Sequence, residues 1–184
     1  MARSINLALR RAITIYQVDK ICIVLAAASI VPFLLHLIPY GSGREIGPIW
    51  LPIYYAPFLA VFFFKPHVSL ITALAAPSLN RLFTGSPMPG VLWQLTIELF
   101  LFILLANLLY VKHKRWVGVS LVSILLTKAI SRIFSYTAAG LFGLGMQQFS
   151  FFLSISRALP GMTVLLIINI AVVLLKDRLS YGRD

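Results

Sequence analysis

Charge is scarce in this chain. Only 11% of its 184 residues are Asp, Glu, Lys or Arg, whereas 60% are hydrophobic and the mean hydropathy is +0.93. Soluble domains carry about 25% charged and roughly 45–50% apolar residues. The shortage of charge therefore excludes a soluble globular enzyme, a disordered tail and a receptor with a large external domain. Because about 20 apolar residues span a bilayer as a helix, we expect residues 1–184 to form one all-α integral membrane domain with about six spans.

Sequence features of catalysis and metal binding are also lacking. Cys22 is the one cysteine, which excludes an internal disulfide and a cysteine-based metal site. The three histidines lie far apart in the chain. There is no glycine-rich phosphate loop, no His-Glu zinc motif and no Gly-x-Ser-x-Gly elbow. We therefore expect no metal, no cofactor and no enzymatic activity, and we favour binding or transport.

Acidic residues are few, with five against sixteen basic ones, so that the net charge is +11. A strongly basic chain can indicate a nucleic-acid partner. Here the basic residues separate apolar runs and form no continuous face, as in membrane proteins that keep Lys and Arg in cytoplasmic loops. We expect a lipid bilayer and no nucleic acid as the surroundings of this chain.

Six apolar runs predict membrane-spanning helices. They cover about 20–39, 48–64, 68–83, 91–111, 117–141 and 151–175. The third run is the weakest, because its length of about 16 residues and its Pro77 also suit a re-entrant segment. Residues 5–18 are expected to form either a short interfacial helix or a solvated leader.

The distribution of basic residues favours six crossings. With both termini in the cytoplasm, eleven Lys and Arg lie on the inner side, and only Arg44 and, near a helix end, Arg81 lie on the outer side. If the third run did not cross, the segment 112–115 (KHKR) would lie outside and this bias would disappear. The positive-inside rule therefore predicts six transmembrane helices with cytoplasmic N- and C-termini.

Polar side chains inside the spans form the candidate site, because each costs a few kcal/mol to insert. Gln94 and Glu98 are four residues apart in the fourth run, and Lys128, Arg132 and Tyr136 have the same spacing in the fifth. Each set therefore shares one helical face. A rise of about 1.5 Å per residue puts Glu98 and Arg132 at a similar depth in the outer half of the bundle.

Further polar residues lie near the outer ends of the third and sixth runs, namely Asn80, Arg81 and Arg157. With the inner half of the spans almost purely apolar, this pattern predicts a pocket open to the outside above a closed plug. Arg81 and Arg157 could instead extend to outer headgroups.

Two interpretations of the central charges remain open. Glu98 and Arg132 could form a structural ion pair that only holds two helices together, or both could bind a ligand. Lys128 lies too deep to reach the headgroups easily, so it needs a partner, a ligand or a water-filled cavity.

Aromatic and small residues give weaker indications. Trp93 belongs to a group of outer aromatics that could stack on a ligand or form the interfacial belt. Ala56 and Ala60 are four residues apart in the second run, and Ala26 lies on a small-residue side of the first. Such faces permit close helix packing, either within the bundle or against a membrane partner.

Three segments carry a resemblance to a known family. They read PFLA at 57–60, AAPSLNRLFTGSPMP at 75–89 and EL at 98–99. They resemble the substrate-binding S component of an energy-coupling factor (ECF) transporter, in the branch with a Pro-x-Leu-x-x-Leu-x-Thr-Gly-x-Pro segment before a Glu on the fourth helix.

The resemblance implies a six-helix protein of a prokaryotic cytoplasmic (inner) membrane. Such a protein captures a vitamin or similar micronutrient from outside, together with a T component and a pair of cytoplasmic ATPases. It implies that segments 40–47 and 143–149 cover the ligand. The implied site comprises Asn80, Gln94, Glu98, Lys128, Arg132, Tyr136 and Arg157, and the implied partner contact is an Ala-x-x-x-Ala pattern.

From the residues and this resemblance, we expect a subunit that binds a small, water-soluble, anionic nutrient. Lys128 and Arg132 would hold its carboxylate, Glu98 would orient the pair, and Trp93 or Tyr136 would pack on a ring. The alternative is a structural membrane scaffold, such as a rod-shape-determining subunit, which needs partner-contacting surfaces but no ligand. A small membrane acyltransferase or phosphotransferase is a third possibility, which the missing catalytic residues disfavour.

Overall fold

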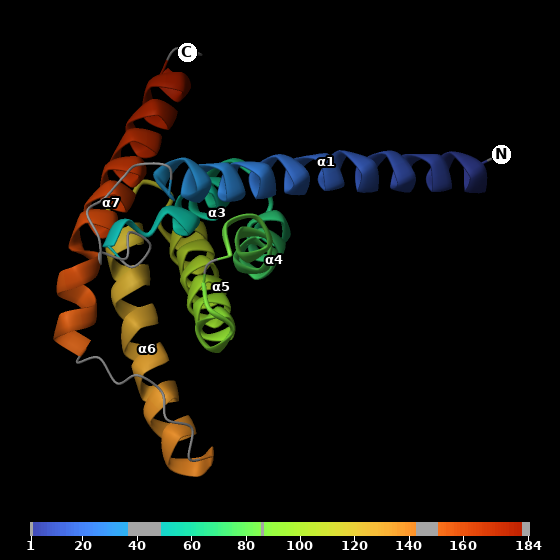
Figure 1. Ribbon diagram of the computed structural model, residues 1–184. Coiled ribbons are helices and arrows are strands. Elements are labelled where there is room, and N and C mark those ends of the chain that lie inside the picture. Colours follow the sequence, from blue (N-terminus) through green and yellow to red (C-terminus); the bar gives the residue numbers. More distant parts are fainter. Residues whose placement is uncertain (1, 37–48, 86, 143–150, 182–184) are drawn as a thin grey trace.

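The computed structural model describes residues 2–36, 49–85, 87–142 and 151–181, and most of these residues are helical. Six α-helices and no strand occur there (Figure 1). They are α1 (Ala2–His36), α3 (Pro52–Phe63), α4 (Pro66–Thr84), α5 (Pro89–Lys112), α6 (Val119–Phe142) and α7 (Phe151–Tyr181). Each of the six apolar runs therefore contains a helix, and the all-α prediction is confirmed for these residues.

Proline and glycine set several helix ends. Pro52, Pro66 and Pro89 occupy the first turns of α3, α4 and α5, where the missing N–H costs no hydrogen bond. Gly85 ends α4 with φ 72°, and its N–H donates to the carbonyl of Arg81 at 2.9 Å. A side chain would strain this left-handed cap, so glycine is the residue that fits.

Helix α1 is longer than the first apolar run. It is continuous from Ala2, so the segment that could have been a solvated leader is helical and joined directly to the apolar part. Its N-terminal half extends away from the other helices in Figure 1.

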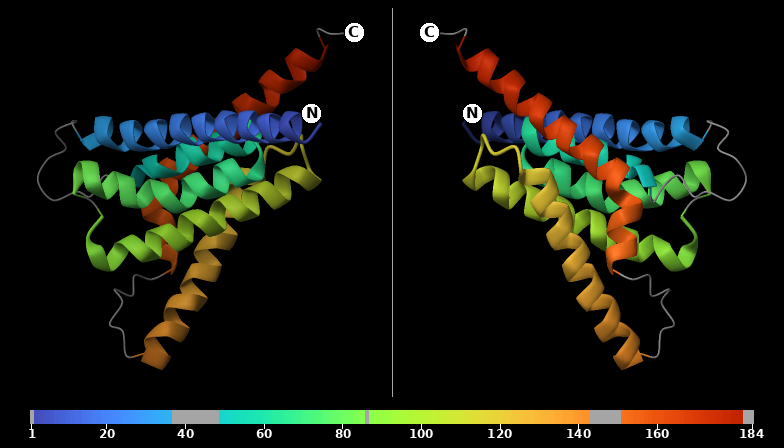
Figure 2. Two further views of the ribbon diagram at one scale, coloured as in Figure 1. Left: turned by 90° about the vertical axis from the view of Figure 1, so that its right-hand side faces the viewer. Right: turned by 90° about the vertical axis from the view of Figure 1, so that its left-hand side faces the viewer.

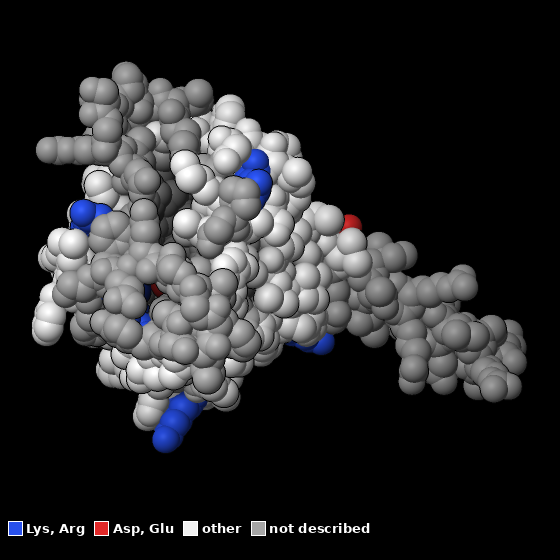
Figure 3. All heavy atoms as spheres, turned by 60° about the horizontal axis from the view of Figure 1, so that its bottom comes forward, with Lys and Arg blue, Asp and Glu red and all other residues white. Residues whose placement is uncertain are grey.

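Three helices contain stretches that are long and apolar enough to cross a membrane, namely 18–35, 91–112 and 152–178. Helix α3 is apolar but has only 12 residues. Many large apolar side chains are exposed, up to 79% at Leu82 and Phe152, and Figure 3 shows a face on which charged side chains are few and scattered. An apolar exterior of this kind is that of a membrane protein.

The helices form one bundle with an oblique pair on its side. Helix α1 packs on α3 and α4, α4 on α5, α5 on α6, and α6 on α7, while α3 also contacts α5. Figure 2 shows α3, α4 and α5 running in roughly one direction, whereas α6 and α7 cross them at an angle. Helix α1 crosses α4, which is seen nearly end-on in Figure 1. Helix α7 comes close to the start of α3 at Gly161, where an added Cβ would lie 2.6 Å from the carbonyl oxygen of Trp50.

The core between α3 and α5 is aromatic. The ring of Phe102 lies 5.4 Å from both Tyr54 and Phe58, between ring centroids. Phe58 also contacts Phe62 at 5.0 Å, and all of these side chains are buried. Edge-on ring contacts add to the apolar packing, so the centre of the bundle is closed.

Small residues pack inside the bundle. Ala56 and Ala60 are 7% and 0% exposed, so they pack against other helices of this chain and are not available to a partner. The sequence left open whether these alanines pack within the bundle or against a membrane partner, and the structure shows packing within the bundle for this pair. Ala26 is exposed on α1.

Candidate functional site

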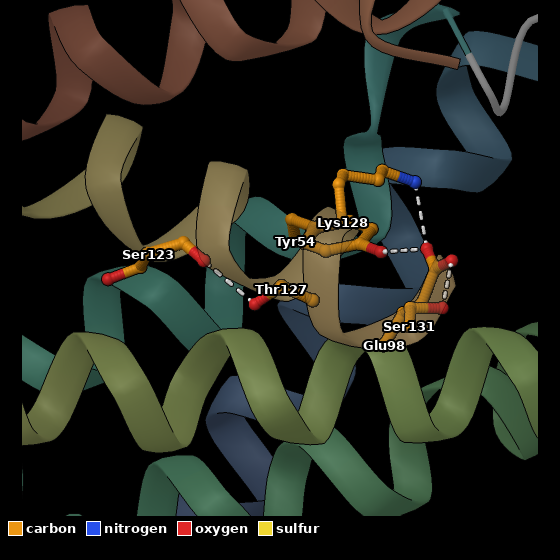
Figure 4. A network of polar contacts seen from close by, with 6 residues as sticks. All are labelled: Tyr54, Glu98, Ser123, Thr127, Lys128 and Ser131. Atoms are coloured by element: carbon orange, nitrogen blue, oxygen red, sulfur yellow. Dashed lines mark hydrogen bonds and ion pairs between the residues drawn. The ribbon is translucent and has the colours of Figure 1, made fainter. Parts of the chain in front are cut away.

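A buried polar cluster centres on the carboxylate of Glu98 (Figure 4). The Lys128 ammonium donates to Oε2 at 2.8 Å, and the Ser131 hydroxyl donates to Oε1 at 2.9 Å. The Tyr54 hydroxyl lies 3.4 Å from Oε2, and the side chain of Gln94 also hydrogen bonds to the carboxylate. Glu98 and Lys128 are only 11% and 14% exposed in their side chains, so this is a buried ion pair with additional hydrogen bonds.

Three helices bring these groups together. Gln94 and Glu98 lie one turn apart on α5, Lys128 and Ser131 lie one turn apart on α6, and Tyr54 comes from α3. Residues three or four positions apart share a helical face, so the spacing that marked the site in the sequence also puts these side chains at the helix contacts.

The ion pair differs from the one that depth suggested. Counting residues along the helices matches Glu98 with Arg132, yet the carboxylate pairs with Lys128, one turn earlier on α6. The count assumed two helices parallel to the membrane normal, whereas α6 crosses α5 obliquely (Figure 2). The need of Lys128 for a buried partner, inferred from its depth, is met by Glu98.

The other candidate residues lie around this cluster. Arg132 is half-buried one turn beyond Lys128 on α6. Trp93 is 39% exposed, and its ring contacts Phe134 with 6.2 Å between centroids, so it joins α5 to α6. The backbone of Tyr136 continues α6, and its side chain lies outside the described residues, as do segments 40–47 and 143–149.

Two candidates lie on other helices. Asn80 is 6% exposed on α4, and Arg157 is exposed on α7. The structure thus brings together Gln94, Glu98 and Lys128 from the predicted set.

Sequence reasoning missed Ser131, and it counted Tyr54 with Trp93 among the outer aromatics that could stack on a ligand or form the interfacial belt. Ser131 follows Lys128 by three positions, so its place on the same face could have marked it. Buried hydroxyls continue along this face of α6 at Ser123 and Thr127, where the Thr127 hydroxyl donates to the carbonyl of Ser123 at 2.8 Å (Figure 4). The α5-facing side of α6 is therefore polar over several turns.

A second polar layer lies toward the other end of α5. The Asn107 amide donates to the Ser69 hydroxyl at 3.0 Å, and Lys176 of α7 donates to the Phe62 carbonyl and the Tyr110 hydroxyl, both at 2.6 Å. These contacts hold α4, α5, α7 and the end of α3 together. Asn107 is an isolated amide within an apolar run, and this feature of the sequence could have identified it as a buried hydrogen-bonding residue.

The chemistry available at the Glu98 cluster is that of binding. The carboxylate is occupied by donors, whereas the Lys128 ammonium has three N–H groups and gives one to Glu98. No group of His, Cys, Asp and Glu suited to hold a metal ion occurs in the part of the chain that the structure describes. Comparison with family models, with curated proteins and with solved structures gives no match, so the family resemblance depends on the quoted segments alone.

Proposed function

We propose that this chain is a six-span substrate-binding subunit of an ECF-type importer, which captures a small, water-soluble, anionic nutrient at the outer side of a prokaryotic cytoplasmic membrane. The observation that carries the proposal is the Glu98–Lys128 pair, which is buried among apolar helices in a bundle with few other charges. Charges inside a membrane protein are costly and are typical of substrate or ion sites.

Six crossings require α3, α4 and α6 to span the membrane beside the three more apolar helices. Their polar residues suit this role, because the most polar ones lie on the sides that face the bundle. Thr72 and Asn80 of α4 are 0% and 6% exposed, and Lys128 of α6 is paired with Glu98. The exposed side of α6 carries Ile130 and Ile133, which suit contact with lipid.

The binding site would lie where α5 and α6 meet. Glu98 fixes the position of the Lys128 ammonium, which leaves two of its N–H groups for a ligand. Arg132 lies one helical turn away and would supply a planar, two-pronged donor for a carboxylate or phosphate group. A cation held in place by a buried acid loses little conformational freedom when a ligand binds.

A structural scaffold is the second candidate, and one observation favours it. Glu98 accepts hydrogen bonds from Lys128 and Ser131 with good distances, so the pair is satisfied without any ligand. In that case the cluster serves to hold α5 against α6, and the partners are other membrane proteins.

Mass spectrometry of small molecules released from detergent-purified protein distinguishes the two candidates. Binding predicts one stoichiometric organic anion with the wild type and its loss with Arg132→Ala, which leaves the ion pair intact. The control is Lys176→Met, which also removes one partly buried cation, but from the second polar layer, where Lys176 has two protein acceptors. This control should retain the ligand.

Co-purification tests the expected partners. An importer subunit should bring down a membrane-embedded T component and an ATPase pair, and the exposed Ala26 side of α1 is the candidate contact, since Ala56 and Ala60 are buried. An empty wild-type protein that brings down only cell-envelope proteins would favour the scaffold.

A further inference from the structure

The turn between α5 and α6 forms a basic hollow at one end of the bundle. Four consecutive residues, His113, Lys114, Arg115 and Trp116, line an open depression of about 620 Å³. The turn has defined hydrogen bonds, because the N–H of Trp116 donates to the carbonyl of His113 at 3.1 Å and the N–H of His113 donates to Leu109 at 2.8 Å. The rings of His113 and Trp116 meet edge to face with 5.9 Å between centroids.

Helix α7 contacts this turn at two points. The amide of Asn169, which is fully buried, donates to the carbonyl of Val117 at 2.5 Å and lies 3.4 Å from that of Trp116. Nε of Arg115 pairs with Asp177 at 3.2 Å. This pair leaves the two terminal amino groups of the guanidinium for another acceptor.

Gly118 shapes the same turn. An added Cβ at this position would lie 2.9 Å from Cε2 of Trp116, so the glycine gives the indole its place beside the backbone. The backbone of the turn and the indole of Trp116 are therefore held by contacts from α7 and by the space that Gly118 leaves.

The hollow also lies at the level where a membrane ends. The apolar stretch 91–112 of α5 leads directly into it, and Trp116 is 40% exposed, as expected for an aromatic residue at headgroup level. Lys114 and Arg115 are exposed cations beside it. Basic pockets next to membrane helices suit the headgroups of anionic lipids.

We propose that this hollow binds the phosphate of an anionic phospholipid headgroup, with Lys114 and Arg115 as the cationic contacts and Trp116 against the glycerol and upper acyl chain. The site is separate from the Glu98 cluster, which lies about 20 Å away along α5 at 1.5 Å per residue. The inference does not depend on the proposed import function.

Quenching of Trp116 fluorescence by brominated lipids tests the proposal. The variant Trp50→Phe/Trp93→Phe leaves Trp116 as the one tryptophan of the chain. The full chain is reconstituted into phosphatidylcholine nanodiscs that contain equal fractions of brominated phosphatidylglycerol or brominated phosphatidylcholine. We expect stronger quenching by brominated phosphatidylglycerol.

Charge variants locate the contact. Lys114→Ala/Arg115→Ala should lower the relative affinity for phosphatidylglycerol, by up to about 5-fold for each cation removed at a membrane surface. Lys114→Arg/Arg115→Lys should retain it. The matched control, Lys20→Ala/Lys65→Ala, removes the same charge from α1 and the α3–α4 turn, and should also retain the preference.

Three results would overturn the assignment. Equal quenching by the two lipids would show no headgroup selection. A loss of preference in the control as large as in Lys114→Ala/Arg115→Ala would mean that overall surface charge is responsible. A preference that is unchanged in Lys114→Ala/Arg115→Ala would place the headgroup contact elsewhere on the molecule.

Discussion

The coupling between Glu98 and Lys128 can be measured by a double-mutant cycle in the free energy of unfolding. Nζ of Lys128 lies 2.8 Å from Oε2 of Glu98, and the two side chains are 14% and 11% exposed. At this distance and an effective dielectric constant of about 20, two unit charges attract each other by about 6 kcal/mol. The cost of removing both charges from water offsets part of this attraction.

Removing one member leaves the other charge buried. We therefore expect Glu98→Gln and Lys128→Met each to lower the free energy of unfolding by about 3 kcal/mol. Glu98→Gln should cost at least as much as Lys128→Met, because Ser131 and Tyr54 still donate to the carboxylate when Lys128 is removed. The double variant buries no unpaired charge, so its loss should be no larger than that of one single variant, which gives a coupling energy of at least about 3 kcal/mol.

Unfolding in mixed micelles, titrated with sodium dodecyl sulfate and followed by circular dichroism, measures these free energies. Glu98→Gln combined with Lys176→Met is the control cycle. Lys176 donates to Phe62 and Tyr110 and shares no partner with Glu98, so these two losses should add. A coupling below about 0.5 kcal/mol between Glu98 and Lys128 would refute the ion pair as a stabilising contact.

Three further variants test the packing around the site. Asn107→Ala should lower the free energy of unfolding by about 1–2 kcal/mol, because the hydroxyl of Ser69 loses a buried donor; adding Ser69→Ala should then cost little more in the same titration. Gly161→Ala would put a Cβ 2.6 Å from the carbonyl oxygen of Trp50. It should therefore lower the melting temperature measured by tryptophan fluorescence. An unchanged melting temperature would mean that α7 does not approach the start of α3 so closely. Cys22 lies within the apolar stretch 18–35, where a bilayer would keep a membrane-impermeant reagent away from its thiol. A membrane-impermeant maleimide should therefore label it only after denaturation, and rapid labelling in intact membranes would exclude α1 as a span.

The positions of the helices were predictable because apolar runs, prolines and glycines act locally. Pro52, Pro66 and Pro89 begin three of the helices, and Gly85 ends one. The polar face of α6 was predictable for the same reason, since a spacing of four residues depends only on the helical repeat.

The partner of Glu98 was not predictable, because it depends on how α6 crosses α5. Crossing angles follow from the fit of side chains along both helices, so a local sequence pattern does not predict them. The same applies to Asn169, whose contact is a backbone carbonyl more than fifty positions away. Sequence reasoning could thus mark Glu98 and Lys128 as polar residues inside the bundle, but it could not say which groups they contact.

The two polar layers together constrain how a solute could cross this bundle. Glu98 and Asn107 are nine positions apart on α5, or about 13 Å at 1.5 Å per residue. Between them Leu99, Phe102 and Ile103 are fully buried, and Phe102 packs against Phe58. A hydrophilic solute held at the Glu98 cluster would have to pass this apolar plug, at the cost of losing its hydrogen bonds and charge contacts. Under the proposed function, this plug favours binding at one side of the bundle over conduction through it. Release at the other side would then require a rearrangement of helices, which the proposed ATPase partners could supply.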